Sequence, residues 1–500
     1  MQKLFCLPIL LALSVPATAT DAPALATEKP VRQRDGEAQP PVALVDRVRA
    51  LMRDIEGGAH AQARVQADAV LADPGFARLP PARQAEMRYL AGWLALVAGD
   101  GPAGYEHLWQ ATRAPSAEAP MWEMFARAAL VLGRFDEACA ALAEMLARFP
   151  ESTDGLDPLL AMSALYHGDA GDYGPGKRRL LETLFAAGLP LNAVGDGSRH
   201  WYELALLRLA GGDRAGTEEA IARIENPEVL VRLLSDRRFD GLAGAPESFD
   251  LRRVAERYEA KLRTRALLQP DVLELQVALV HALRSLDAAE AAVALAEATG
   301  PAENFVDGDT QWIWMRNALA NALLQLGRHE EALRVLAEAA AASRGGHDGV
   351  SLVLNHAQVL ASLQQPQAAL DPLSDLGAMS GYGRLVLVDV QHRAALQTGN
   401  AASAAAALAY LREHGTAFPV FATNALLDEG RIDEAAETVV AALADPLTRG
   451  DMLLHLQRYR EVTLPGDAAV TAGWETLRSR EDVAAAVDAH GRILDVPLYR

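Results

Sequence analysis

The sequence predicts an all-α protein built as a solenoid of antiparallel helical hairpins, arranged in two lobes. Three observations lead to this prediction. The chain has 500 residues, which is too long for one compact core but suits a continuous array of small units. Hydrophobic residues make up 50% of it and aromatic residues only 6%, without the recurring alternation that strands require. A helix–turn–helix pattern, in contrast, returns along most of the chain.

The stretch 122–150, WEMFARAALVLGRFDEACAALAEMLARFP, contains one complete hairpin. A break at Gly133 separates an Ala-rich first helix from a second helix, which opens with Asp136 and Glu137. Acidic residues in the first turn complement the helix dipole, and Pro150 ends the helix because proline cannot continue it.

Small and large side chains alternate along this stretch as two closely packed helices require. Ala126 and Ala138 permit the approach, and Trp122 and Leu142 fill the space beside them. Together with Pro150, these residues fall at the spacing of a tetratricopeptide repeat (TPR), so the hairpin resembles that family. The resemblance implies a right-handed TPR-like α-solenoid in which the first helices of successive hairpins line a concave face.

Further copies support the repeat. Four residues precede matching residues of the first stretch by 34 positions: Gly92, Gly104, Leu108 and Ala111 precede Ala126, Ala138, Leu142 and Met145. The stretch 317–339 fits the TPR pattern closely, and small residues equivalent to Ala332 recur at Ala289, Ala369, Ala404 and Ala435. GRIDEA at 430–435 nearly repeats GRFDEA at 133–138. The chain therefore resembles a divergent, exported bacterial TPR-repeat protein.

The first residues have the layout of a secretory signal peptide. Residues 1–19 combine Lys3, an apolar run too short to span a bilayer, and small residues before a cleavage site after Ala19. Residues 20–41 are rich in Pro, Ala and charge and are expected to form a disordered leader. We expect a periplasmic protein, with secretion as the alternative. Cleavage removes Cys6 and leaves Cys139, expected to be a small buried residue.

The remaining chain divides by pattern into four parts. We expect an N-terminal TPR-like lobe at 42–233, an irregular connector at 234–268 that includes a helix from Leu251 to Leu268, and a C-terminal lobe at 269–450. Residues 451–500 depart from the pattern and are expected to form a helical cap over the last repeat, since an uncapped solenoid exposes apolar surface.

Charge and motifs exclude several functions. The formal net charge of −19 becomes −20 once Lys3 is removed with the signal peptide, which disfavours nucleic-acid partners. No apolar run of transmembrane length follows the signal peptide, so an integral membrane protein is not expected. His329 precedes two Glu residues but lacks a second His one turn on, and no phosphate loop or nucleophile motif occurs. We therefore predict no catalytic residue, metal or cofactor.

The candidate ligand contacts are the polar and aromatic residues of the face that the resemblance places in the groove. Asn317 and Asn321 lie one helical turn apart, so their carboxamides could hold an extended peptide backbone, with Trp314 as an apolar anchor. The full set is Trp314, Asn317, Asn321, Gln325, Gln358, Asp389, Arg393 and Asn424.

Two functions are compatible with this pattern. The first is a periplasmic scaffold or adaptor that binds a protein or extended peptide in its concave groove, without enzymatic activity and with self-association possible. The alternative is a helical-solenoid enzyme or small-ligand receptor acting on cell-envelope glycans or peptides, with its site between the lobes near 236–249. An enclosed pocket with convergent Asp, Glu or His would favour the alternative.

Overall fold

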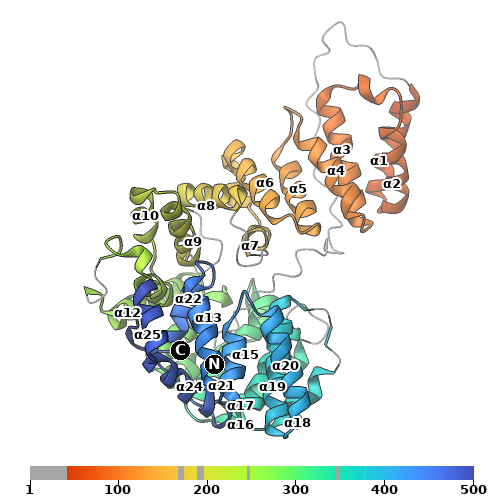
Figure 1. The fold of residues 1–500 in the computed structure, drawn as a ribbon. Coiled ribbons are helices and arrows are strands. Elements are labelled where there is room, and N and C mark those ends of the chain that lie inside the picture. The colour runs from red at the N-terminus through yellow and green to blue at the C-terminus, as the bar shows by residue number, and fades with distance from the viewer. Residues whose placement is uncertain are drawn as a thin grey trace. The chain divides into compact units, whose positions relative to one another are not determined.

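The structure is a computed structural model that describes residues 42–166, 174–188, 196–244, 248–343, 349–374, 376–377 and 379–500. The predicted signal peptide and leader lie outside these residues. The described chain forms two compact units, residues 42–188 and 196–500. Its regular structure consists of helices α1 to α25, short 3₁₀ turns and one pair of strands (Figure 1), so the all-α fold is confirmed. None of the described helices has both the length and the hydropathy that crossing a bilayer requires.

The N-terminal unit contains three helical hairpins followed by α7 and α8. The hairpins are α1 (Val42–Glu56) with α2 (His60–Leu71), α3 (Pro81–Val97) with α4 (Gly101–Thr112), and α5 (Ala119–Val131) with α6 (Phe135–Arg148). Helix α8 (Pro175–Ala187) packs mainly on α6, and α7 (Pro158–Tyr166) packs on α5 and α6. Cys139 is buried in α6, as predicted, and its Sγ lies 3.2 Å from the carbonyl oxygen of Ala164.

Small residues control how closely these helices approach. Ala126 and Ala138 are both fully buried, as predicted. In the preceding hairpin, a Cβ added to Gly92 would lie 2.5 Å from Leu108 Cγ, so only glycine fits between α3 and α4. Trp122 differs from the prediction: it is half-buried beside a surface cleft, with the Arg148 guanidinium 5.1 Å above its ring.

The C-terminal unit continues the same plan. It opens with the hairpin of α9 and α10, followed by α11 and α12, and five further hairpins pair α13 with α14, α15 with α16, α17 with α18, α19 with α20, and α21 with α22. The bounds are α9 Ser198–Ala210, α10 Arg214–Ile221, α11 Pro227–Ser235, α12 Leu251–Leu268, α13 Leu273–Ser285, α14 Ala289–Ala298, α15 Gly308–Gln325, α16 His329–Ala342, α17 Gly349–Ser362, α18 Pro366–Leu370, α19 Gly381–Gln397, α20 Ala401–His414, α21 Val420–Asp428 and α22 Ile432–Ala444.

One backbone position sets the register of these hairpins. In the five hairpins from α13 to α22, a residue with positive φ forms each turn, and the alanine five positions later is at most 2% exposed. In the hairpin of α15 and α16 these residues are Gly327, with φ +72°, and Ala332. The turn of α13 and α14 is made by Asp287, with φ +68°, so the residue equivalent to Ala332 is Ala292. The assignment of Ala289 to this position was therefore wrong, because no glycine marks the turn in the sequence.

The unit boundary differs from the predicted connector at 234–268. Helices α9 to α11 belong with the C-terminal unit. The carbonyl oxygens of Leu234 and Ser235 accept hydrogen bonds from Arg492, at 2.9 Å each, and Arg237 Nε donates to Gly491 at 3.1 Å. The long-range bonds make this stretch part of the C-terminal unit instead of a linker. The predicted helix from Leu251 to Leu268 is present as α12.

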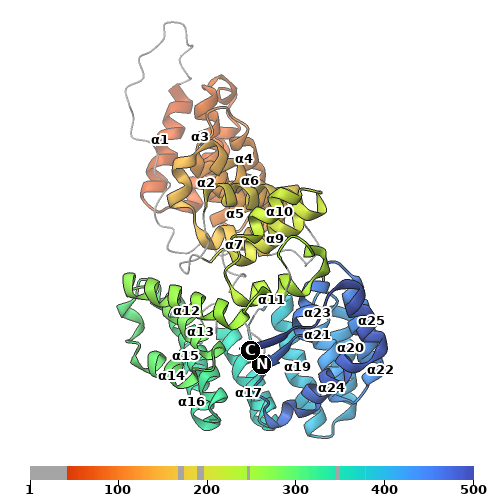
Figure 2. The same cartoon turned by 90° about the vertical axis from the view of Figure 1, so that its left-hand side faces the viewer.

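Residues 451–500, the C-terminal segment, have two roles. The end of α23 (Arg449–Leu456), α24 (Ala468–Ser479) and α25 (Glu481–His490) pack on the last hairpin, α21 and α22. Strand β1 (Arg458–Arg460) also pairs in parallel with β2 (Asp495–Tyr499), and β2 contacts α12 and α13 at the start of the hairpin series. Figure 2 shows the C-terminus between these early helices and the late ones. The two strands were not predicted.

Candidate functional site

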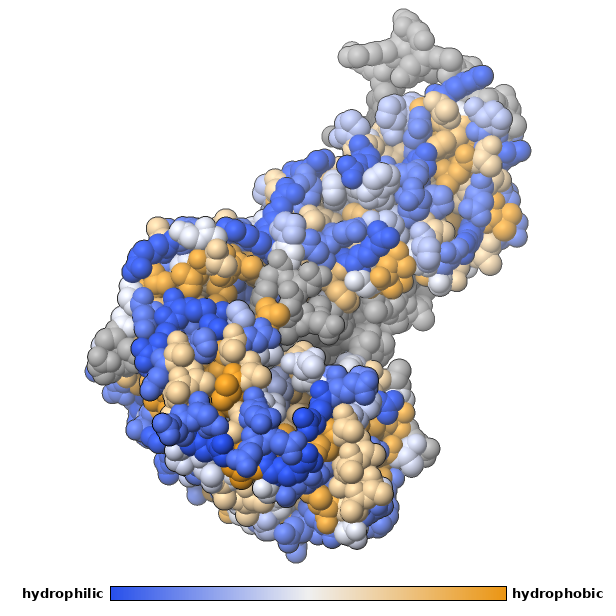
Figure 3. Space-filling model, in the orientation of Figure 1, coloured by the Kyte–Doolittle hydropathy of each residue, from blue (hydrophilic) through white to orange (hydrophobic). Residues whose placement is uncertain are grey.

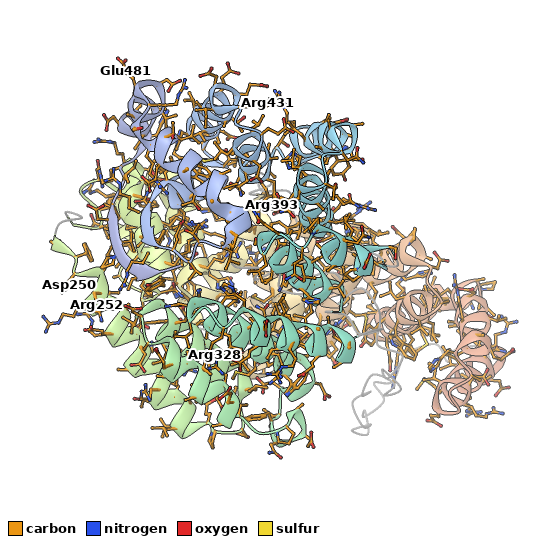
Figure 4. The ribbon with its side chains drawn as sticks, turned by 90° about the horizontal axis from the view of Figure 1, so that it is seen from below. Asp250, Arg252, Arg328, Arg393, Arg431 and Glu481 are labelled. Carbon is orange, nitrogen blue, oxygen red and sulfur yellow. The ribbon has the colours of Figure 1, made fainter. Side chains whose placement is uncertain are left out.

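The first helices of the hairpins in the C-terminal unit, namely α13, α15, α17, α19 and α21, form what we call the inner wall. They line a cavity of about 200 Å³, and the C-terminal segment supplies the facing side. Figure 4 places Arg393 in the interior of this unit, whereas Arg252, Arg431 and Glu481 lie toward its outside. The cavity is therefore built by helices far apart in sequence.

Seven of the eight predicted ligand contacts line this one cavity. They are Trp314, Asn317, Asn321, Gln358, Asp389, Arg393 and Asn424. The exception is Gln325, whose Nε2 donates to the carbonyl oxygen of Arg284 at 3.3 Å and so joins two neighbouring hairpins.

A common helix register explains why these side chains converge. Asn321, Gln358, Arg393 and Asn424 each lie six residues before the positive-φ residue of their turn. His281 has the same position before Asp287 and also lines the cavity. Sequence reasoning missed His281 because its turn lacks glycine, although the six-residue spacing would have identified it.

The inner wall is not an open groove, because the C-terminal segment crosses it. Leu464 is 1% exposed and belongs to the same apolar cluster as Leu319 and Val359. Three residues further on, Asp467 accepts a hydrogen bond from Arg393 Nη1. The cap predicted at 451–500 thus also occupies the face that was predicted to receive a ligand. A local sequence pattern could not predict this, because tertiary contacts hold the segment there.

Polar contacts attach this segment to predicted groove residues. Asp467 Oδ1 lies 2.6 Å from Arg393 Nη1 and accepts a second hydrogen bond from Ser362 Oγ at 2.8 Å. Trp474 Nε1 donates to Asn424 Oδ1 at 2.9 Å. The segment therefore contacts α17, α19 and α21 by side chains that could equally hold another polypeptide.

Three carboxyl groups surround the single guanidinium group of Arg393. Its Nε lies 3.4 Å from Asp428 Oδ2 and 3.8 Å from Asp389 Oδ2, in addition to the Asp467 contact. Burial raises the pKa of Asp428 to about 7 and outweighs the nearby guanidinium. Burial also raises the pKa of Asp389. For Arg393, burial opposes the charge, but the three carboxyl groups together hold its pKa above the ordinary value.

Basic groups line the part of the cavity next to α13. Arg284 is 8% exposed, and its Nη1 donates to the carbonyl oxygen of Arg500 at 3.1 Å. Burial lowers the pKa of Arg284 to about 10 and also lowers the pKa of Arg500. The oxygen that Arg284 contacts belongs to the last residue of the chain, and the acidic side chain of Glu461 lines the same cavity. Sequence reasoning missed both arginines, because Arg284 lies off the six-residue register and Arg500 lies in the predicted cap.

The site predicted for the enzyme alternative is not at this cavity. No residue of 236–249 lines it among the described ones; that stretch instead contacts residues 491 and 492. Acidic and histidine side chains do converge in the cavity, namely Asp389, Asp467, Glu461, His281 and His455. In the described chain, no three His, Cys, Asp or Glu side chains are placed to hold a metal ion.

The N-terminal unit has a separate surface cleft of about 760 Å³. Aromatic residues of α4 and α5 line it, together with arginines of α6 and α8: Tyr105, Trp109, Trp122, Phe125, Arg148 and Arg179. Guanidinium groups stack on two of the rings, Arg113 on Trp109 at 4.7 Å and Arg148 on Trp122 at 5.1 Å. Such aromatic and arginine side chains are typical of protein-binding surfaces.

Comparison with known proteins adds structural likeness only. No protein-family model matches the sequence, and no curated protein matches it. A crystal structure of yeast Tom70 is similar at a TM-score of 0.32 and 10% identity, covering 89% of this chain and 99% of that one. The Naa15/Naa10 complex bound to HypK-THB has a TM-score of 0.24 and 13% identity, covering 90% and 78%. The TPR domain of P58(IPK) has a TM-score of 0.20 and 12% identity, covering 88% and 100%.

Likeness at these TM-scores carries no argument by itself. The class of this protein follows instead from its own hairpins, in which a positive-φ turn separates two helices and a buried small residue, in most of them alanine, lies five positions beyond it. It is an all-α repeat protein with a TPR-like fold. The right-handed twist stays a prediction.

Proposed function

We propose that the protein is a periplasmic scaffold or adaptor that binds an extended polypeptide segment along its inner wall and performs no covalent chemistry. One observation carries this proposal: residues 461–467 of its own chain already lie against the inner wall, ending in a 3₁₀ turn at Pro465–Asp467. Leu464 is buried against the wall and Asp467 is bound by Arg393. An external segment that displaces these residues, and turns as they do so that an apolar and an acidic side chain face the wall, would find the same contacts.

The wall has the composition that peptide recognition needs. The carboxamides of Asn317, Asn321 and Gln358 line the cavity and can both donate to and accept from a peptide backbone. Trp314 lies on the same helix as the two asparagines and offers an apolar surface. The visible face of the unit shows apolar residues in small patches among hydrophilic ones (Figure 3). With a net charge of −19, the chain disfavours nucleic acid as a partner.

The periplasmic location is proposed from residues 1–19 alone, whose signal-peptide pattern predicts export and cleavage after Ala19. Secretion beyond the envelope and self-association stay open predictions.

Site-specific crosslinking in the exporting cell tests the scaffold proposal. A photo-reactive amino acid at Gln358, which lines the cavity, should form an adduct with a second polypeptide chain. The same amino acid at Glu338, on the outer helix α16 and exposed, serves as the control. The triple change Trp314→Ala, Asn317→Ala and Asn321→Ala should weaken the adduct. Equal labelling from both positions, or an adduct unaffected by the triple change in a folded chain, would refute the proposal.

The small-ligand receptor or enzyme acting on envelope glycans or peptides is kept as a second candidate, because the acidic residues Asp389, Asp467 and Glu461 line a partly enclosed cavity. If the protein is such an enzyme, it should release a product from cell-wall fragments, and Asp389→Asn should abolish that release. Mass spectrometry of fragments incubated with the parent protein and with the variant distinguishes turnover from binding.

A further inference from the structure

The inner wall presents a buried hydrogen-bond acceptor that the described chain does not satisfy. Asn355 of α17 is 4% exposed, and its Nδ2 donates to Asn317 Oδ1 at 3.0 Å. Its own Oδ1 is left as an acceptor without a partner among the described residues. Both residues line the cavity. Because buried polar atoms are normally hydrogen-bonded, a bound molecule that donates to this oxygen would be favoured.

The C-terminal segment supplies a second such acceptor from the facing side of the cavity. His455 Nδ1 lies 2.7 Å from the carbonyl oxygen of Asp451. A carbonyl oxygen only accepts, so Nδ1 carries the proton and Nε2 holds a lone pair. Burial lowers the pKa of His455 to about 3, which keeps the ring neutral. Nε2 is buried without a partner in the described part of the chain, and His455 lines the cavity.

Carboxamide groups in the same cavity supply hydrogen-bond donors. The side-chain oxygen of Asn317 accepts from Asn355, and that of Asn424 accepts from Trp474 Nε1 at 2.9 Å. The amide nitrogens of Asn317 and Asn424 therefore keep their hydrogens for a ligand. A hydroxyl group both donates and accepts, so a molecule with several hydroxyls matches these donors and the two unsatisfied acceptors at once.

Charged side chains in the lining disfavour an ion as the ligand. Four arginines and three acids line the cavity. Arg393 is bound to Asp467 at 2.6 Å, and Arg478 Nε donates to the carbonyl oxygen of Leu456 at 2.9 Å. A charged ligand would lose its hydration in a cavity where both signs are present and partners are already taken. A neutral ligand avoids this cost.

The size of the cavity limits the ligand to about one sugar ring. Its volume is about 200 Å³. An engineered cavity of about 150 Å³ in another protein holds benzene, and pockets for drug-sized ligands are usually about 300–1,000 Å³. There is therefore room for one ring with its substituents. The indole rings of Trp314 and Trp474 line the cavity and can pack against the C–H faces of such a ring.

We infer that the cavity binds one neutral sugar ring, which contacts the inner wall on one side and the C-terminal segment on the other. Its hydroxyl groups donate to Asn355 Oδ1 and His455 Nε2. They accept from the carboxamide nitrogens of Asn317 and Asn424. Because the sugar joins the two sides, its binding holds the segment against the wall and opposes any polypeptide that displaces the segment. This goes beyond the scaffold proposal and involves no cleavage of the sugar.

Calorimetric titration of the mature chain, residues 20–500, tests this inference with glucose, galactose, mannose and N-acetylglucosamine. At least one of these neutral sugars should bind with a dissociation constant below about 1 mM. The charged analogues glucosamine and glucuronate should bind at least about tenfold more weakly than the best neutral sugar, because each carries a charge into the cavity.

One variant and one local measurement place the sugar in this cavity. Asn355→Leu removes the acceptor with little change in side-chain size, so it should weaken binding at least about fivefold. Asn304→Leu, at an exposed position outside the cavity, is the matched control and should bind as the parent does. In the parent, saturating sugar should slow amide hydrogen exchange in residues 461–474.

The outcomes separate this inference from the scaffold proposal. If none of the four neutral sugars binds, or if a charged analogue binds better than all of them, the inference is wrong. It is also wrong if Asn355→Leu binds as the control does, or if the sugar leaves exchange in 461–474 unchanged. Should Asn355→Leu fail to fold, the titrations and the exchange measurement on the parent still decide. Crosslinking from Gln358 in the absence of sugar tests the scaffold proposal alone, so either proposal can fail without the other.

Discussion

Replacing Asp467 by alanine should release the C-terminal segment from the inner wall. Asp467 accepts two hydrogen bonds, from Arg393 at 2.6 Å and Ser362 at 2.8 Å, and the side chains of Asp467 and Arg393 are only 15% and 13% exposed. Hydrogen bonds to charged groups contribute about 1.5–3 kcal/mol. Arg393 keeps Asp389 and Asp428 as partners, so the loss should stay within that range and not reach the value for an isolated buried charge.

Amide hydrogen exchange measures this effect locally, which matters because a chain with two units need not unfold in one step. A change of about 1.5–3 kcal/mol corresponds to exchange roughly 10- to 150-fold faster in residues 462–474. Glu475→Ala is the control, because Glu475 is 62% exposed and its partner Arg478, itself buried, keeps its hydrogen bond to the carbonyl oxygen of Leu456. Unchanged exchange in Asp467→Ala, or exchange equal to the control, would show that the segment is held by apolar contacts alone.

Three further predictions concern a packing glycine, a buried carboxyl group and the predicted cleavage site. Gly92→Ala should destabilise the N-terminal unit by about 1–3 kcal/mol, because the added Cβ would lie 2.5 Å from Leu108 Cγ. Gly155→Ala is the control, since its Cβ would meet no atom within 4 Å. Thermal melting compares the two variants, and equal melting temperatures would contradict the packing argument. Burial raises the pKa of Asp428 from 3.8 to about 7, so the folded state binds more protons than the unfolded state in this window, and stability falls as pH rises through it. Asp428→Asn should therefore flatten the decrease in melting temperature between pH 5 and 7.5, and parallel curves would count against the buried carboxyl. The exported chain should begin after Ala19, and intact mass measurement of the periplasmic fraction would show an uncleaved chain if the signal-peptide prediction is wrong.

Local patterns in the sequence were sufficient to predict the hairpins and much of the candidate site. Asn317 and Asn321 could be placed on one face because a helix repeats every 3.6 residues and a glycine at 327 marks where the helix ends. The same reasoning failed at His281, where Asp287 forms the turn and no glycine sets the register. Gln325 was assigned to the groove by the same periodicity. It does not line the cavity, and its Nε2 donates to the main-chain oxygen of Arg284 instead.

The residues that face the inner wall could not be predicted in this way. Arg393 and Asp467 are 74 residues apart, and Arg284 and Arg500 are 216 residues apart. Neither separation belongs to the repeat, so no periodic pattern connects these partners. Residues 451–500 depart from the repeat pattern, and that departure indicated a cap without indicating which face the cap would cover.

The sequence by itself determined the helical hairpins, their small packing residues and the face that presents polar side chains, because these depend on contacts within one or two neighbouring helices. Only the tertiary structure decided whether that face is open. It also decided the protonation of Asp428, since a carboxyl group's pKa depends on burial and on charges brought close by distant parts of the chain. The inner wall could thus be predicted from the sequence. The C-terminal segment that faces the wall, and the pKa values of the acids in the cavity, depend on contacts between distant parts of the chain.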